Sequence, residues 1–146
     1  MSINKFNFLI VLASAFASCK QQPDYKASRD EVIKVHDVVM ADQGKVVDQQ
    51  MRLNDMLKNL SALKLKNPEI DTLKERDSIA IVRDRLNVAE EAMNTWMHEF
   101  EPDVTGKSNE EAVAYFQAEK QKIEKVDTLF KAELKRAEAY LSKFKK

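Results

Sequence analysis

Glycine, proline and cysteine are scarce in this chain. Its 146 residues include two glycines, three prolines and one cysteine. Collagen-like sequences and β domains with many tight turns need far more glycine and proline. Because Gly44 and Gly106 are the only glycines, neither of the common glycine-rich phosphate loops can form. A single cysteine also excludes a disulfide framework within the chain.

An excess of charge of either sign is missing as well. The chain has 24 basic and 24 acidic residues, although charged residues make up 33% of it. Binding to nucleic acid by counterion release requires a clear cationic excess. We therefore expect no nucleic-acid partner.

Residues suited to catalysis are few. A Ser/His/Asp triad would have to include His36 or His98, the only histidines, and no motif for a strained nucleophile turn is present. The Glu-x-x-His pattern of di-iron bundles is excluded because Ile33 and Thr95 occupy the positions where it needs glutamate. The motif H-E-x-x-H is missing too. We predict that the chain has no catalytic residues and is not an enzyme.

The first eighteen residues have the pattern of an export signal. Lys5 supplies one positive charge, and residues 8–17 form an uninterrupted run of apolar and small side chains. A helix of ten residues rises about 15 Å, half the thickness of a bilayer core. Such a run is typical of a secretory signal peptide and is too short for a transmembrane helix. We assign residues 1–18 to a signal peptide.

The sole cysteine lies where this signal would be cleaved. Residues 16–19 read Phe-Ala-Ser-Cys and resemble the lipobox of bacterial lipoproteins, although Phe16 departs from the usual leucine. The resemblance implies that Cys19 is diacylated on its sulfur and acylated on its new amine, and so attaches the protein to a membrane. It also implies a location in the bacterial cell envelope, where we expect the outer membrane, facing the periplasm or the surface. The alternative is an ordinary secretory signal beside a cysteine without a role.

The cysteine is followed by a short tether and a single domain. Residues 20–27 are polar, include Pro23 and show no hydrophobic period. Eight extended residues span about 25 Å. We assign residues 19–27 to the lipidated cysteine and its tether, and residues 28–146 to the domain.

The domain begins with the pattern of a long helix. Ser28 and Glu31 match a capping box, in which a serine begins a helix and a glutamate follows three residues later. Apolar residues then recur every seven positions, at Val32, Val39, Val46, Leu53 and Leu60. This spacing is that of a helix with one buried face, and we place the helix at residues 29–66.

Two breaks lead to two further helices. Pro68 suits the first position of a new helix, with Asn67 as its cap, and an apolar stripe through Trp96 extends this helix over residues 68–100. A second capping box begins at Ser108, and we place a third helix at residues 109–144. Because both connections are short, neighbouring helices should be antiparallel. The predicted fold is all-α: an up-down-up bundle of three long helices with near-heptad packing.

Three stretches of the domain carry a resemblance to a known group of proteins. They are Arg29, Asp30, Glu31 and Val32 with Val35, His36, Asp37, Val39 and Met40; Met93 with Trp96, Met97, His98 and Phe100; and Glu119 and Lys120 with Ile123, Glu124, Val126 and Asp127. In these stretches the chain resembles small bacterial lipoproteins often labelled "viral A-type inclusion protein". That label reflects similarity to a long coiled coil, so the resemblance implies no particular chemistry.

One predicted layer has the composition of a soft-metal site. In an antiparallel pair that turns near residues 66–67, His36 is level with Met97, and Met40 is level with Met93. Imidazole and thioether groups suit Cu(I), and a His/Met couple also ligates haem iron. These four residues are the candidate ligands of a copper or haem carrier.

A packed core layer explains the same residues without a ligand. At about 100° per residue, His36 and Met97 fall within the apolar stripes, whereas His98 falls on the outer face near the end of its helix. Methionine packs favourably against tryptophan, and His36 would be neutral and hydrogen-bonded. We favour this interpretation, with no metal and no cofactor, over a soft-metal or haem carrier and over a histidine pH switch.

The C-terminal end of the chain is rich in lysine. Residues 135–146 contain five basic residues, among them Lys143, Lys145 and Lys146, and one acidic residue. Cations at a helix C-terminus interact favourably with the macrodipole, which is the simpler explanation. The alternative is a partner-binding site for an anionic envelope polymer or a lipid headgroup.

Taken together, these patterns predict a lipid-anchored protein of the cell envelope that acts as a spacer or as a binding module. Its partner would be a protein or an anionic envelope component. A heptad pattern suits monomers, trimers and filaments alike, so the oligomeric state is left open.

Overall fold

The described part of the chain is entirely helical. The computed structural model describes residues 24–144, which form α1 (Tyr25–Lys58), α2 (Leu60–Lys66), α3 (Thr72–Glu99) and α4 (Asn109–Ser142). The predicted all-α class is therefore confirmed for these residues, with four helices where three were predicted. The predicted signal peptide, Cys19, Lys145 and Lys146 lie outside the described residues. None of the described helices is both long and apolar enough to cross a membrane.

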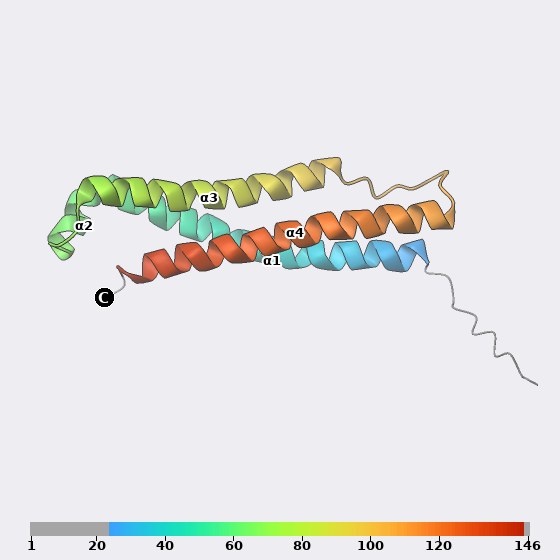
Figure 1. The fold of residues 1–146 in the computed structure, drawn as a ribbon, viewed down its shortest axis with the longest axis horizontal. Helices are drawn as coiled ribbons and strands as arrows, with labels where there is room; N and C mark the ends of the chain where they lie inside the picture. Colours follow the sequence, from blue (N-terminus) through green and yellow to red (C-terminus); the bar gives the residue numbers. More distant parts are fainter. Residues whose placement is uncertain (1–23, 145–146) are drawn as a thin grey trace, which may run out of the picture.

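Helices α1, α3 and α4 lie side by side along an elongated molecule (Figure 1). In the view of Figure 1, α1 and α4 run from right to left, and α3 runs from left to right. The 34 residues of α1 correspond to a length of about 50 Å. The start of α1 lies at one end of the molecule, and α2 and the end of α4 lie at the other (Figure 1).

The first helix begins four residues earlier than predicted. Asp24 is its N-cap, and the Asp24 side chain accepts a hydrogen bond from the backbone N–H of Lys26 at 3.1 Å. The capping box predicted at Ser28 is therefore wrong, because Ser28 lies inside the helix with its N–H bonded to the Asp24 carbonyl. Asp24 provides an acceptor one turn earlier, so Tyr25, Lys26 and Ala27, which were assigned to the tether, are helical.

The first helix also ends before residue 66, because Asn59 interrupts it. Asn59 leaves the helical conformation, and both its backbone N–H and its side-chain amide donate to the Asp55 carbonyl. Asparagine side chains compete in this way for backbone groups and so favour helix ends. The predicted helix at residues 29–66 is thus split into α1 and the seven-residue α2.

The connection to α3 is longer than Asn67 and Pro68 suggested. Asp71, not Asn67, is the N-cap, and its carboxylate accepts the backbone N–H groups of Leu73 and Lys74 at 3.0 and 3.3 Å. These two bonds, led by that from Lys74, lower the pKa of Asp71. A carboxylate that satisfies two free N–H groups is the stronger cap, so the helix predicted to start at residue 68 begins at Thr72.

The start of α4 agrees with the sequence. Ser108 and Glu111 form the predicted capping box: the Glu111 N–H donates to Ser108 Oγ, and the Ser108 N–H donates to Glu111 Oε2 at 2.8 Å. Hydrogen bonds from Ser108 lower the pKa of the Glu111 carboxyl. Gly106, just before this cap, has a φ of +88°, a conformation that glycine adopts without strain.

The buried face of each long helix follows the predicted apolar spacing. In α1 the buried residues are Val32, Val39, Val46 and Leu53. They form one core with the stripes of α3 and α4, which include Leu86, Met93, Phe116, Ile123 and Phe130. On the surface beside this core, Gln43 Nε2 donates to Glu90 Oε1 at 3.1 Å and Gln50 Nε2 to Asn87 Oδ1 at 2.9 Å. These contacts between α1 and α3 match the register expected of a helix pair that turns near residues 66–67.

Candidate functional site

His36 lies at the edge of the core rather than within it. Its ring centroid is 6.0 Å from that of Trp96. This agrees with the predicted register, in which His36 is level with the neighbouring residue Met97. However, the ring is partly exposed, and its Nδ1 lies 2.9 Å from the Asp37 carboxylate on the surface. His36 thus has a hydrogen-bond partner, as predicted, but its predicted position within the core is wrong, because Val32 and Val39 occupy the buried positions on either side of it.

The methionines of the predicted layer are divided between core and surface. Met93 is fully buried, whereas Met40 and Met97 are 38% and 39% exposed. Met97 was predicted to point inward, but Trp96 takes the core position, and the next residue is turned by about 100°. His98 is exposed in the last turn of α3, as predicted. The four candidate ligands are thus not enclosed in one layer.

A metal site of another composition is not apparent in residues 24–144. In this part of the chain, no group of three or more histidine, cysteine, aspartate and glutamate side chains is placed to hold a metal ion. Buried polar side chains instead form contacts between α3 and α4.

The most buried of these contacts joins Trp96 to Glu119. The indole Nε1 donates to Glu119 Oε2 at 3.0 Å, and both side chains are buried. Phe100 stacks on the indole at 4.7 Å between ring centroids. The second carboxylate oxygen of Glu119 accepts from Lys122 at 2.7 Å, and this bond raises the pKa of Lys122. The sequence signal of this burial is the place of Glu119 between Phe116 and Ile123 on the apolar stripe of α4.

Two further polar contacts follow along the same face of α4. Glu133 is buried and pairs with Arg136 at 3.0 Å and with Arg85 of α3 at 3.7 Å. Seven residues, or about two helical turns, later, the Tyr140 hydroxyl donates to the Glu75 carboxylate of α3. Burial and this bond raise the pKa of Tyr140. Because Glu119, Glu133 and Tyr140 are separated by multiples of seven residues, all three face α3.

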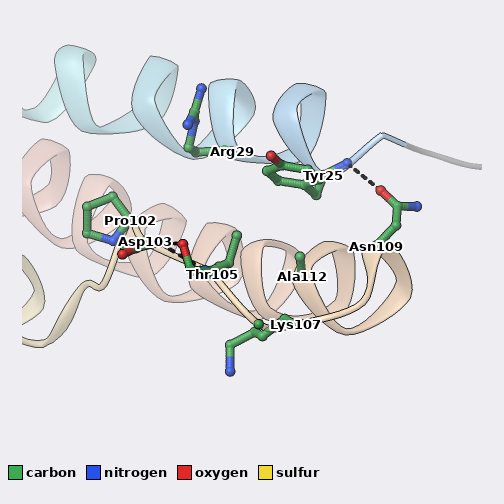
Figure 2. A pocket seen from close by; sticks show the side chains of 10 residues that line it. Tyr25, Arg29, Pro102, Asp103, Thr105, Lys107, Asn109 and Ala112 are labelled. Carbon is green, nitrogen blue, oxygen red and sulfur yellow. Dashed lines mark hydrogen bonds between the residues drawn. The ribbon is translucent and has the colours of Figure 1, made fainter.

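A cavity lies at the end of the molecule where α1 begins. It has a volume of about 300 Å³ and is lined by α1, the loop before α4 and the first turn of α4 (Figure 2). The start of α4 is held to α1 by the backbone N–H of Tyr25, which donates to Asn109 Oδ1 at 3.1 Å. Figure 2 shows Arg29 and Lys107 pointing away from each other on opposite sides. The lining therefore does not gather charge of one sign around a ligand.

The lysine-rich end of the chain lies at the opposite end of the molecule (Figure 1). The ammonium group of Lys143 lies over the Tyr140 ring, 5.2 Å from its centroid. Two open clefts of about 390 and 410 Å³ flank Phe144, between α4 and the segment around Asn67. Lys145 and Lys146 follow directly in the sequence but lie beyond the described residues.

Comparison with known proteins found no matching protein family, curated protein or solved structure. Cys19, the predicted lipidation site, precedes residues 24–144 by five positions.

Proposed function

We propose that the protein is a lipid-anchored, non-catalytic spacer of the bacterial cell envelope, built as an up-down-up bundle of three long helices. The observation that most supports this function is the placement of the start of α1 and of α2 at opposite ends of an elongated molecule (Figure 1). An anchor attached before α1 would hold one end at a membrane and leave the other end far from it. This separation of ends is what a spacer requires.

An anchor at Cys19 would hold the start of α1 close to the membrane. Five residue steps separate Cys19 from Asp24, the N-cap of α1, and an extended chain of that length reaches about 18 Å at most. The helical part is about 50 Å long. The α1 end would therefore stay near the lipid headgroups, while the far end could contact a partner in the space beyond them.

The interior of the molecule also suits a rigid spacer. The three contacts from Glu119, Glu133 and Tyr140 to α3 are spaced along the length of α4. Buried polar pairs specify one register of two helices, because a shift would leave a charged group without its partner.

We further propose that the chain is related to the small lipoproteins it resembles and that it lies in the outer membrane.

Membrane fractionation of cells that express the full chain tests this function. Wild-type protein should sediment with membranes and partition into the detergent phase. The Cys19→Ser variant should become soluble or keep its first eighteen residues, whereas Ser18→Ala, which retains a small residue before the cysteine, should behave like wild type. Normal processing and membrane retention of Cys19→Ser would refute the lipid anchor.

A further inference from the structure

The end of the molecule opposite the start of α1 differs in charge from the rest. We define the distal tip as Lys58, α2, residues 67–74 and the Lys143–Phe144 segment; its elements lie together at one end of the molecule (Figure 1). Four lysines of this tip form no ion pair with a described carboxylate: Lys58, Lys66, Lys74 and Lys143.

Cations along the helical shaft are mostly neutralised. Lys45 pairs with Asp42 at 2.7 Å, Lys131 with Asp127 at 2.6 Å, and Lys120 joins α4 to Glu31 of α1 at 3.3 Å. Of the carboxylates at or beside the tip, Glu69 is exposed in the turn before α3, and two others are used elsewhere. Asp71 caps α3, and Glu75 accepts the hydroxyl of Tyr140. The ammonium groups of the four lysines without an ion pair can therefore meet an external anion.

The tip also carries the two most exposed large apolar side chains of the described residues. Leu65 is 83% exposed, and Leu73 is 65% exposed. Leu65 lies on α2, a helix with no buried residue, and is flanked in sequence by Lys64 and Lys66. Lys64 holds the turn beside it by donating to the carbonyls of Pro68 and Ile70 at 2.6 Å each. Leu65 is thus presented by a turn that is fixed in place.

This combination suits a flat anionic surface better than a peptide. Leu65 and Leu73 line neither of the clefts at this end, so they do not form a groove that would hold a peptide. Projecting apolar side chains enter the boundary between headgroups and acyl chains, and lysines around them interact with anionic headgroups. Lysine stems can also extend along apolar groups while their ammonium groups reach the phosphates.

We propose that the distal tip binds the surface of an anionic phospholipid bilayer. The proposal relies on the function proposed above, because an anchor at Cys19 would place this tip about 50 Å from the first membrane. The anchored protein would then bridge two bilayers. The lysines supply the attraction to the second bilayer, and Leu65 and Leu73 supply the apolar contact.

A vesicle-tethering assay with the full, lipidated chain tests the proposal. Protein is incorporated through its anchor into phosphatidylcholine vesicles, and capture of fluorescent vesicles of phosphatidylglycerol and phosphatidylethanolamine is measured by flotation. The double variant Leu65→Ser/Lys66→Glu should reduce capture at least about tenfold. The matched shaft variant Val88→Ser/Lys125→Glu changes an apolar residue that is 58% exposed and a lysine that pairs with no described carboxylate. It should leave capture within about twofold of wild type.

Each other arm of the assay also has a decisive outcome. Capture should fall at high salt and be weak with phosphatidylcholine targets, because exposed charges are screened by ions. Equal capture by the tip and shaft variants, or equal capture of neutral and anionic targets, would overturn the proposal. Tip-dependent binding of poly-glutamate with no capture of anionic vesicles would favour an acidic polypeptide and overturn it too. Failure of the protein to float with the first vesicles would refute the anchor instead, and circular dichroism confirms that each variant is folded.

Discussion

Trp96 and Glu119 face each other across the interface of α3 and α4, and the indole N–H donates to the buried carboxylate at 3.0 Å. A buried donor and a buried charge are both costly unless they are hydrogen-bonded. Each therefore supplies what the other needs, and Lys122 neutralises the carboxylate from its exposed side. The pair holds the only tryptophan of the chain at one position between the two helices.

Truncation of Trp96 should be strongly destabilising. Trp96→Ala removes the stacked contact with Phe100 and leaves Glu119 without a donor, and loss of a buried aromatic side chain typically costs about 3–5 kcal/mol. The free energy of unfolding is measured by urea denaturation of the full chain in mild detergent. A loss below about 1 kcal/mol would mean that Trp96 is not part of the core.

Removal of the carboxylate should also weaken the fold, and to a smaller extent. Glu119→Ala leaves the indole N–H buried and unpaired, which costs about 1–3 kcal/mol. Glu124→Ala is the matched control, because Glu124 is exposed on the same helix and also pairs with a lysine, at 3.8 Å. That variant should lose less than about 0.5 kcal/mol. Equal losses in the two variants would show that the Trp96–Glu119 contact does not contribute to the free energy of unfolding.

The two serines that were predicted as helix caps should respond differently to the same substitution. Ser108→Ala removes an observed capping box and should cost about 1 kcal/mol. Ser28→Ala changes a residue inside α1 and should stay within about 0.5 kcal/mol of wild type. Urea denaturation at neutral pH gives both values. A larger loss from Ser28→Ala than from Ser108→Ala would contradict the observed start of α1.

Tyr140 should make the fold sensitive to alkali. Burial and its bond to Glu75 raise the pKa of Tyr140 above its ordinary value near 10. The neutral hydroxyl is thus favoured in the folded state, so its contribution to stability is complete below about pH 10 and is lost as the pH rises further. Between pH 8 and pH 11, the midpoint of urea unfolding should fall more for wild type than for Tyr140→Phe. An equal fall in both proteins would contradict this role.

The full chain should bind no Cu(I) tightly. Met93 is buried, whereas Met40, Met97 and His36 lie partly exposed on the surface, so a common coordination sphere would require α1 and α3 to repack. Titration against a competing chelator provides the measurement. Stoichiometric binding that is lost in His36→Ala and in Met97→Ala, but kept in His98→Ala, would instead support the soft-metal carrier.

Apolar spacing predicted the parts of the fold that depend on burial. The apolar residues that recur every seven positions from Val32 to Leu53 are buried as expected, and the buried stripe of α3 includes Trp96. Such spacing reports which face of a helix is inward over many turns, so single errors have little effect. The helix ends were harder to predict from the sequence. Asp24, Asn59 and Asp71 set these ends through one or two local hydrogen bonds, which leave no periodic pattern.

The polar residues were the least predictable. Glu119 carries the charge typical of a surface residue but follows the spacing of the core residues of its helix. Its burial depends on a partner from another helix, Trp96, whose indole donates to its carboxylate. Met97 shows the reverse case, since its apolar character suggested burial and its place after Trp96 exposes it. The tip lysines likewise became distinct only when the fold showed which cations already have partners.

Lipidation of Cys19 changes the intact mass of the protein, which can be measured after extraction from membranes. We expect a chain that begins at Cys19, with the mass of residues 19–146 increased by a diacylglyceryl group and one further acyl chain. The same preparation from Cys19→Ser should lack these additions. A wild-type mass that corresponds to an unmodified thiol at Cys19, or to cleavage at another position, would refute the lipid anchor.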